Sequence, residues 1–151
     1  GIAGKKGFTS ITLEKSLMNS EVGFVEKVLA VIGKRGISFE HLPSGIDTMS
    51  LVIDNEYLKD GVLQQLIDEM TATVHPDKVY THENIALIAT VGHGMARNVG
   101  TSARLFKALS EAGINVNMID QGSSELNIIV GVENQDYADC LKAIYNEFFN
   151  V

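Results

Sequence analysis

The stretch GFVEKVLAVIGKRGI, residues 23 to 37, decides the fold because it recurs as GTSARLFKALSEAGI at residues 100 to 114. In each copy the apolar residues follow the period of a helix, and a glycine ends the helical pattern. The copies lie 77 residues apart (100 minus 23), and the match holds without a gap from about residue 8 to residue 53. The 151-residue chain is therefore predicted to contain two copies of one structural unit.

The first copy has the element order of a ferredoxin-like unit. Period-two alternation or short apolar runs predict strands, and helical spacing predicts a second helix. The expected elements are a strand at FTSITLE (8–14), the helix above, strands at ISFEHL (37–42) and MSLVID (49–54), a helix at EYLKDGVLQQLIDEM (56–70) and a strand at KVYTH (78–82). The order β-α-β-β-α-β predicts an α+β fold with one antiparallel sheet and both helices on one face.

The second copy repeats this order but stops before a fourth strand. Its expected elements are NIALIATVG (84–92), TSARLFKALSEAG (101–113), INVNMID (114–120), ELNIIVGV (125–132) and the helix DYADCLKAIYNEFF (136–149). Because an open sheet edge is an aggregation liability, residues 1–4 are expected to end a strand that completes this unit. The predicted units are 5–82 and 83–151. Each holds about 70 residues and buries limited core, so we expect side-by-side sheet pairing and a homodimer.

Composition excludes several classes of function. Lys and Arg total 12 against 19 Asp and Glu, and the net charge of -7 repels nucleic acids and anionic membranes. RNA-recognition domains share this element order, but they display aromatic residues on their strands, and INVNMID and ELNIIVGV have none. The single Cys140 excludes an internal disulfide and indicates a buried thiol in a reducing, cytoplasmic setting. No apolar run approaches the ~20 residues that span a bilayer.

No catalytic or metal-binding motif is present in the sequence. The four histidines have no shared metal-ligand spacing, and one cysteine cannot form a Cys-x-x-Cys clip. GHGMARNVG, residues 92 to 100, is the nearest approach to a phosphate-binding loop, but it lacks the third glycine and a lysine. A plain turn from strand to helix is the favoured interpretation. We therefore predict no catalytic residue, no metal and no cofactor in this chain.

The repeat instead points to a binding site at one end of each sheet. In this topology the turn into the first helix and the start of the second strand lie at the same end, which places Met18 to Val25 beside Ser38 to Glu40. Free amides at the helix start favour a carboxylate, and Glu40 or Asp47 would hold an ammonium group, a combination that suits a free amino acid. Both acids are expected to have few packing partners, so that replacing either would weaken effector binding with little loss of folding stability.

The corresponding segments of the second unit are Met95 to Ser102 and Asn115 to Asn117. An alternative without a ligand also fits the residues in both units. In that alternative Ser20 and Asn98 cap helices, and Asn115 satisfies the end of a strand.

Three segments together resemble a known family. KGFTSITLEKSLMNSEVGF (6–24), SFEHLPSGIDT (38–48) and INVNMIDQGSSELNIIVGV (114–132) are similar to the tandem ACT domains at the C-terminus of aspartokinase, of the Gram-positive monofunctional type. The resemblance implies a regulatory fragment that binds lysine and/or threonine and feedback-inhibits phosphorylation of aspartate. The kinase portion, with its ATP and magnesium, would lie upstream. The alternative is a non-catalytic dimerisation module with vestigial ligand pockets.

The resemblance also implies a set of effector-binding residues. They are Met18, Ser20, Gly23, Phe24, Val25, Ser38, Phe39, Glu40, Ser44 and Asp47 of the first unit, with Asn115 and Val116 of the second. Lysine-sensitive members often have histidine at the position of Ser20 and aspartate at that of Glu40. These departures leave lysine, threonine or both together open as the effector.

Overall fold

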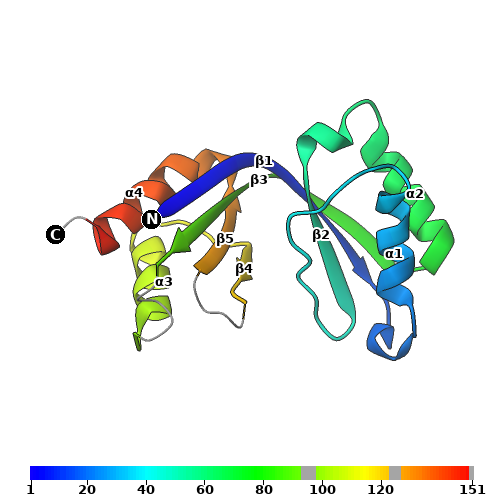
Figure 1. Ribbon diagram of the computed structural model, residues 1–151, viewed down its shortest axis with the longest axis horizontal. Coiled ribbons are helices and arrows are strands. Elements are labelled where there is room, and N and C mark those ends of the chain that lie inside the picture. The colour runs from blue at the N-terminus through cyan, green and yellow to red at the C-terminus, as the bar shows by residue number, and fades with distance from the viewer. Residues whose placement is uncertain (93–97, 123–126, 150–151) are drawn as a thin grey trace. The chain divides into compact units, whose positions relative to one another are not determined.

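The computed structural model describes residues 1–92, 98–122 and 127–149, and the chain divides into two compact units (Figure 1). The first unit is Phe8–Glu83, and the second combines Gly1–Gly7 with the chain from Asn84 onward. Two strands, β1 (Ile2–Glu14) and β3 (Lys78–Val91), contribute residues to both units.

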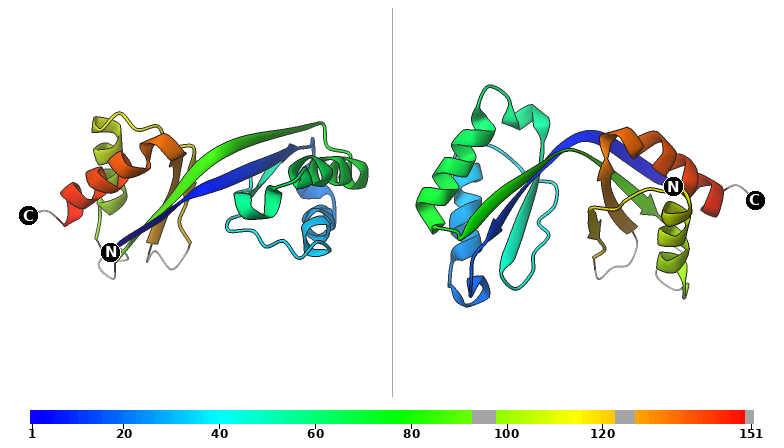
Figure 2. Two further views of the ribbon diagram at one scale, coloured as in Figure 1. Left: turned by 90° about the horizontal axis from the view of Figure 1, so that it is seen from above. Right: turned by 180° about the vertical axis from the view of Figure 1, so that it is seen from behind.

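In the first unit, α1 (Phe24–Gly33) and α2 (Val62–Val74) cover one face of the strands (Figure 2). The strand order is β2-β1-β3, and β2 (Thr48–Asp54) pairs antiparallel with β1, with Leu51 opposite Ile11. Short 3-10 helices precede α1 (Met18–Ser20) and α2 (Asn55–Leu58). The side chains that fill the core are Ile11, Leu13, Met49, Leu51 and Ile53 from the sheet, and Phe24, Val28, Val31, Ile32, Leu66, Met70 and Val74 from the helices.

In the second unit the strand order is β1-β3-β5-β4, so the amino-terminal part of β1 lies next to β3. The elements after β3 are α3 (Thr101–Glu111), β4 (Met118–Asp120), β5 (Asn127–Glu133), a 3-10 turn (Asn134–Asp136) and α4 (Tyr137–Phe148). β5 pairs antiparallel with both β3 and β4. Its core contains Ala86, Ile88, Leu105, Leu109, Ile128, Val130, Val132, Cys140 and Ile144. The helices and antiparallel strands of both units confirm the predicted α+β, ferredoxin-like fold class.

The predicted strand at ISFEHL is wrong in detail, because this segment forms only isolated bridges beside β2. His41 bridges Val52, and Ser44 bridges Met49. The Glu40 amide donates to the Val52 carbonyl at 2.8 Å, and the His41 carbonyl accepts from the Val52 amide at 3.0 Å. Pro43 has no amide proton, so the ladder is interrupted there. The predicted strand INVNMID is likewise reduced to Met118–Asp120.

The expected strands at the junction of the two units are longer than the sequence indicates. KVYTH and NIALIATVG form the single strand β3, and β1 begins six residues before FTSITLE. Gly7 and Asn84, which are equivalent in the repeat, both have positive φ, at 93° and 61°. Glycine and asparagine tolerate this conformation better than other residues, so each strand continues through this position without ending.

Cys140 is fully buried, as predicted, and burial raises the pKa of its thiol to about 12, with a smaller contribution from the negative charge of Asp136. Because folding disfavours the thiolate, this group stabilises the fold below the unfolded thiol pKa of 9.0, and that contribution declines as the pH rises through the folded value. We expect Ellman's reagent at pH 8 to leave native protein unmodified and to react fully in 6 M guanidinium chloride. Rapid labelling of native protein would contradict this burial.

Candidate functional site

The turn between β1 and α1 adopts an unusual backbone conformation that leaves the start of α1 uncapped by a side chain. Leu17 has a φ of 62°, which is uncommon for a bulky residue, and its side chain is exposed. Gly23, with a φ of 81°, is the N-cap of α1 and has no side chain with which to bond the first amides. The alternative in which Ser20 caps α1 is therefore wrong. The N-cap residue therefore supplies no carboxylate to the positive, amino-terminal end of the α1 dipole.

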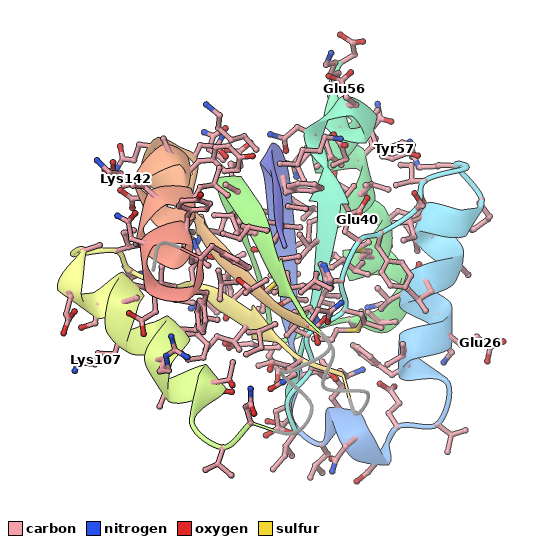
Figure 3. The ribbon with its side chains drawn as sticks, turned by 60° about the vertical axis from the view of Figure 1, so that its left-hand side comes forward. Glu26, Glu40, Glu56, Tyr57, Lys107 and Lys142 are labelled. Carbon is pink, nitrogen blue, oxygen red and sulfur yellow. The ribbon has the colours of Figure 1, made fainter. Side chains whose placement is uncertain are left out.

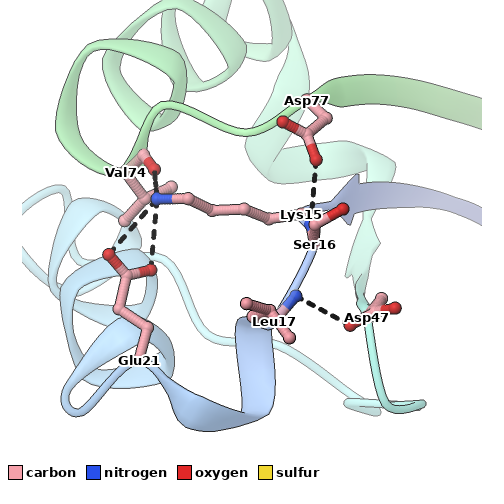
Figure 4. A network of polar contacts seen from close by, with 7 residues as sticks. All are labelled: Lys15, Ser16, Leu17, Glu21, Asp47, Val74 and Asp77. Carbon is pink, nitrogen blue, oxygen red and sulfur yellow. Dashed lines mark hydrogen bonds and ion pairs between the residues drawn. The ribbon is translucent and has the colours of Figure 1, made fainter.

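Two carboxylates hold the beginning of this turn (Figure 4). The Ser16 amide donates to Asp77 Oδ2 at 2.8 Å, and the Leu17 amide donates to Asp47 Oδ1 at 3.0 Å. The Asp47 backbone carbonyl also accepts from the Lys15 amide at 2.9 Å. Asp47 was expected to be a loop acid with few partners, and this expectation is wrong because its side chain and backbone both fix the turn.

Lys15 is a third anchor of the turn. Its Nζ donates to the Val74 carbonyl at 2.7 Å and contacts both carboxylate oxygens of Glu21 at 3.2 Å (Figure 4). Sequence reasoning missed Lys15 and Asp77. The Lys15 bond to Val74 spans 59 residues and the Asp77 bond to Ser16 spans 61, and no local pattern marks such contacts.

The predicted contact residues of the first unit separate into buried and exposed groups. Met18 and Phe24 belong to the core, whereas Val25, Phe39 and Glu40 are exposed. The remaining exposed members are Ser20, Ser38, Ser44 and Asp47, and Gly23 is half-buried. Among these residues, the structure joins Asp47 directly to the turn through the Leu17 amide.

Glu40 and Ser38 lie on the extended segment that follows α1. Glu40 is labelled in Figure 3, and its carboxylate has no hydrogen bond to any residue that the structure describes. The Ser38 hydroxyl donates to Tyr57 Oη at 3.3 Å.

Glu40 is thus an acid without a side-chain bond among the described residues, but the predicted placement of Ser38 to Glu40 beside the turn is wrong. Glu40 pairs with Val52, which lies opposite Ser10 of β1, whereas the turn follows Glu14, which lies opposite Thr48. The acid beside the turn is Asp47, whose Oδ2 has no bond within the part of the chain that the structure describes.

In the second unit, the structure covers the predicted residues only in part. Met95 and residues 93–97 of GHGMARNVG lie outside the described residues. Gly100, with a φ of 91°, is the N-cap of α3, and the Asn98 carbonyl accepts from the Thr101 hydroxyl at 3.1 Å. The Asn98 side chain therefore does not cap α3 as the alternative without a ligand required.

Asn115 is exposed, and Val116 packs against the second core. The backbone amide of the neighbouring Asn117 donates to the Gly131 carbonyl at 2.8 Å. The side-chain amide of Asn117 is buried and has no partner among the described residues. Asn117 therefore continues the pairing between β4 and β5 for one residue beyond the strand.

A separate cavity of about 220 Å³ lies in the second unit, between the start of α3 and the end of α4. Its lining includes Thr90, Asn98, Thr101, Arg104 and Phe148. Neither Asn115 nor Val116 lines it, so it is distinct from the predicted contact residues. The Arg104 guanidinium is already bonded to the Glu147 carboxylate and backbone carbonyl, both at 2.9 Å.

The described ranges contain no cluster of three or more histidine, cysteine, aspartate or glutamate side chains that could hold a metal ion. Within the same ranges, no helix has the length and apolar character needed to cross a membrane.

We expect Asp47→Ala to lower the free energy of unfolding by about 1 kcal/mol, because the Leu17 amide loses its acceptor. Glu40→Ala is the matched control, and it should change the free energy of unfolding by less than about 0.5 kcal/mol. Urea denaturation followed by circular dichroism measures both values. Equal stability of the two variants would show that the Asp47 contact contributes nothing to the fold.

Comparison with known proteins supports a regulatory domain. A family model described as the ACT domain matches residues 88–148. Aspartokinase 3 of Bacillus subtilis is 41% identical over 149 residues, which cover 99% of this chain and 33% of the relative. The chain thus spans about a third of the length of this relative.

Solved structures agree with the sequence comparison. The crystal structure of Clostridium acetobutylicum aspartate kinase superposes with a TM-score of 0.94 at 52% identity, over 98% of this chain and 34% of that one. A C-terminal regulatory domain of aspartate kinase from Porphyromonas gingivalis gives a TM-score of 0.78 at 27% identity, over 99% and 97% of the two chains.

The repeated ferredoxin-like units, with a glycine-opened helix in each, define a tandem ACT regulatory module. The comparisons then place the chain more narrowly: it belongs to the regulatory ACT regions of the aspartokinases. The resemblance predicted from the three sequence segments is confirmed. The prediction that the chain is a regulatory portion, and not a kinase portion, is confirmed by the match to a separate regulatory domain over nearly its whole length.

Proposed function

We propose that this chain binds an end-product amino acid, lysine and/or threonine, and thereby feedback-inhibits ATP-dependent phosphorylation of aspartate in lysine, threonine and methionine biosynthesis. The observation that carries the proposal is the start of α1, which has glycine as its N-cap and follows a turn fixed by Asp47 and Asp77. A related structure, Escherichia coli aspartokinase III in complex with lysine and aspartate, superposes at a TM-score of 0.79 with 25% identity.

The chemistry of the turn suits an amino-acid zwitterion. The amides and dipole at the start of α1 favour an α-carboxylate, and Gly23 allows close approach of a ligand to the backbone. Asp47 lies beside the turn, and its Oδ2 supplies a charge-assisted hydrogen bond to an ammonium group. Exposed Ser20 and Val25 offer a hydroxyl and an apolar contact on the same segment.

The proposal includes the partners of the chain. We propose that two copies of the chain form a homodimer through pairing of their ACT units. The chain is coupled to a kinase domain elsewhere in a longer cytoplasmic protein, and only that domain binds ATP and magnesium. Feedback requires the effector to bind one state of the protein more tightly than the other, and a coupling free energy of ~1–3 kcal/mol suffices.

Calorimetric titration with lysine, threonine and methionine, singly and in combination, tests the proposal. A saturable heat signal for lysine or threonine is expected, and Asp47→Ala should weaken it while preserving the far-ultraviolet circular dichroism spectrum. Absence of binding for all three amino acids would overturn the proposal and favour a dimerisation module with vestigial pockets.

A further inference from the structure

We propose that Lys15 is a positioning residue for the effector site, because it fastens the turn between β1 and α1 to the C-terminal end of α2. This inference rests on the proposed function and adds to it a residue that does not itself need to touch the effector. The turn carries Met18, Ser20 and Gly23. Its only regular structure is the three-residue helix Met18–Ser20, so the polar anchors must define its conformation.

The Lys15 ammonium has three acceptor atoms within bonding distance. Nζ lies 2.7 Å from the Val74 carbonyl oxygen and 3.2 Å from each carboxylate oxygen of Glu21. It also lies 5.7 Å from the centre of the Phe24 ring, at the first residue of α1. One side chain therefore contacts α2, the middle of the turn and the start of α1.

The surroundings shield the Lys15 ammonium more than that of an ordinary surface lysine. The Lys15 and Glu21 side chains are 24% and 37% exposed, so the pair is partly shielded from water. By comparison, the ion pair between Lys34 and Glu69 in the same unit has a lysine that is 69% exposed. Geometry and shielding both favour Lys15 as the more strongly held cation.

The contact with Val74 satisfies the end of a helix. Val74 is the last residue of α2, and carbonyl groups in the last turn of a helix have no partner within the helix. A cation at this end also interacts favourably with the helix dipole. The Lys15 ammonium thus stabilises the C-terminal end of α2 and holds Glu21 at the same time.

The second link between the turn and α2 is Asp77, which lies just before β3. Its carboxylate accepts from the Ser16 amide at 2.8 Å, and its own amide donates to the Glu14 carbonyl at 2.8 Å. The end of β1 and the segment after α2 are therefore bonded to each other on both sides of Lys15. A turn fixed in this way loses less conformational entropy when a ligand binds, which increases affinity.

Lys15→Met tests the inference, because it keeps most of the apolar side chain and removes the charge. Lys34→Met is the matched control in the same unit, where the lysine bonds only Glu69 at 3.3 Å. With lysine and threonine as calorimetric probes, Lys15→Met should weaken binding about tenfold, and Lys34→Met should change it less than about twofold. Hydrogen exchange should accelerate about tenfold at Met18 to Gly23 in Lys15→Met, while β1 and β2 amides remain as protected as in the wild type.

The outcomes distinguish this inference from the proposed function. Failure of the wild-type chain to bind either probe would overturn both. Wild-type binding with unchanged affinity in Lys15→Met, or uniformly faster exchange across the first unit, would overturn only the positioning role. If Lys15→Met does not fold, Glu21→Gln replaces it, since this change weakens the ion pair and leaves the Val74 bond. About threefold weaker binding is then expected, and unchanged affinity would overturn the inference.

Discussion

Phe24→Ala is expected to lower the free energy of unfolding by about 3–5 kcal/mol. Phe24 is only 2% exposed and belongs to the core formed by α1, α2 and the strands of the first unit. Truncation would leave a cavity beneath the first turn of α1 and remove the ring that lies near Lys15 Nζ. Urea denaturation followed by circular dichroism provides the measurement.

Val25→Ala is the control for Phe24→Ala, because it removes apolar surface from the adjacent residue on the exposed side of the helix. Val25 is 39% exposed, so its replacement should cost less than about 1 kcal/mol. Similar losses in the two variants would contradict the burial of Phe24. This contrast also separates the predicted contact residues, because Phe24 acts through packing and Val25 remains accessible to a ligand.

Gly131→Ala is expected to lower the free energy of unfolding by about 1–3 kcal/mol through overpacking. A Cβ atom at this position would lie 2.7 Å from Asn117 Oδ1 and 2.9 Å from Met118 Cβ. Met118 Cβ is fixed to the backbone of β4, so β4 would have to move away from β5. Thermal unfolding measures the loss.

Gly33→Ala is the matched control for Gly131→Ala. Gly33 ends α1, has no positive φ, and a Cβ there would meet no atom within 4 Å. Alanine should therefore raise stability by about 0.5–1 kcal/mol, since glycine is the poorer helix former. A Gly131→Ala protein as stable as Gly33→Ala would show that β4 is not packed as described.

The repeat made the fold predictable, because two copies of the same apolar spacing constrain each other. Strand boundaries were harder to predict. The continuity of β3 depends on Asn84 adopting a positive φ within an extended segment, and no apolar pattern indicates this. The loss of the strand at ISFEHL depends on Pro43, whose missing amide interrupts the ladder to β2.

The turn that carries the candidate site can be predicted from the sequence, but the contacts of its side chains cannot. The expected topology places a turn before the first helix, and the structure gives Gly23 a φ of 81° at the N-cap of that helix. Asp47 is predicted to bind a ligand, and the structure adds that its Oδ1 accepts from the Leu17 amide. Tertiary contacts of this kind join distant segments, so local sequence patterns cannot reveal them.

The most direct test of effector binding at the turn is a titration of the ¹⁵N-labelled chain with lysine and with threonine, followed by amide chemical shifts. Saturable shifts are expected in Leu17 to Val25 and around Asp47, with small changes in α4. Saturable shifts centred on α3 and α4, around the cavity of the second unit, would contradict effector binding at the turn.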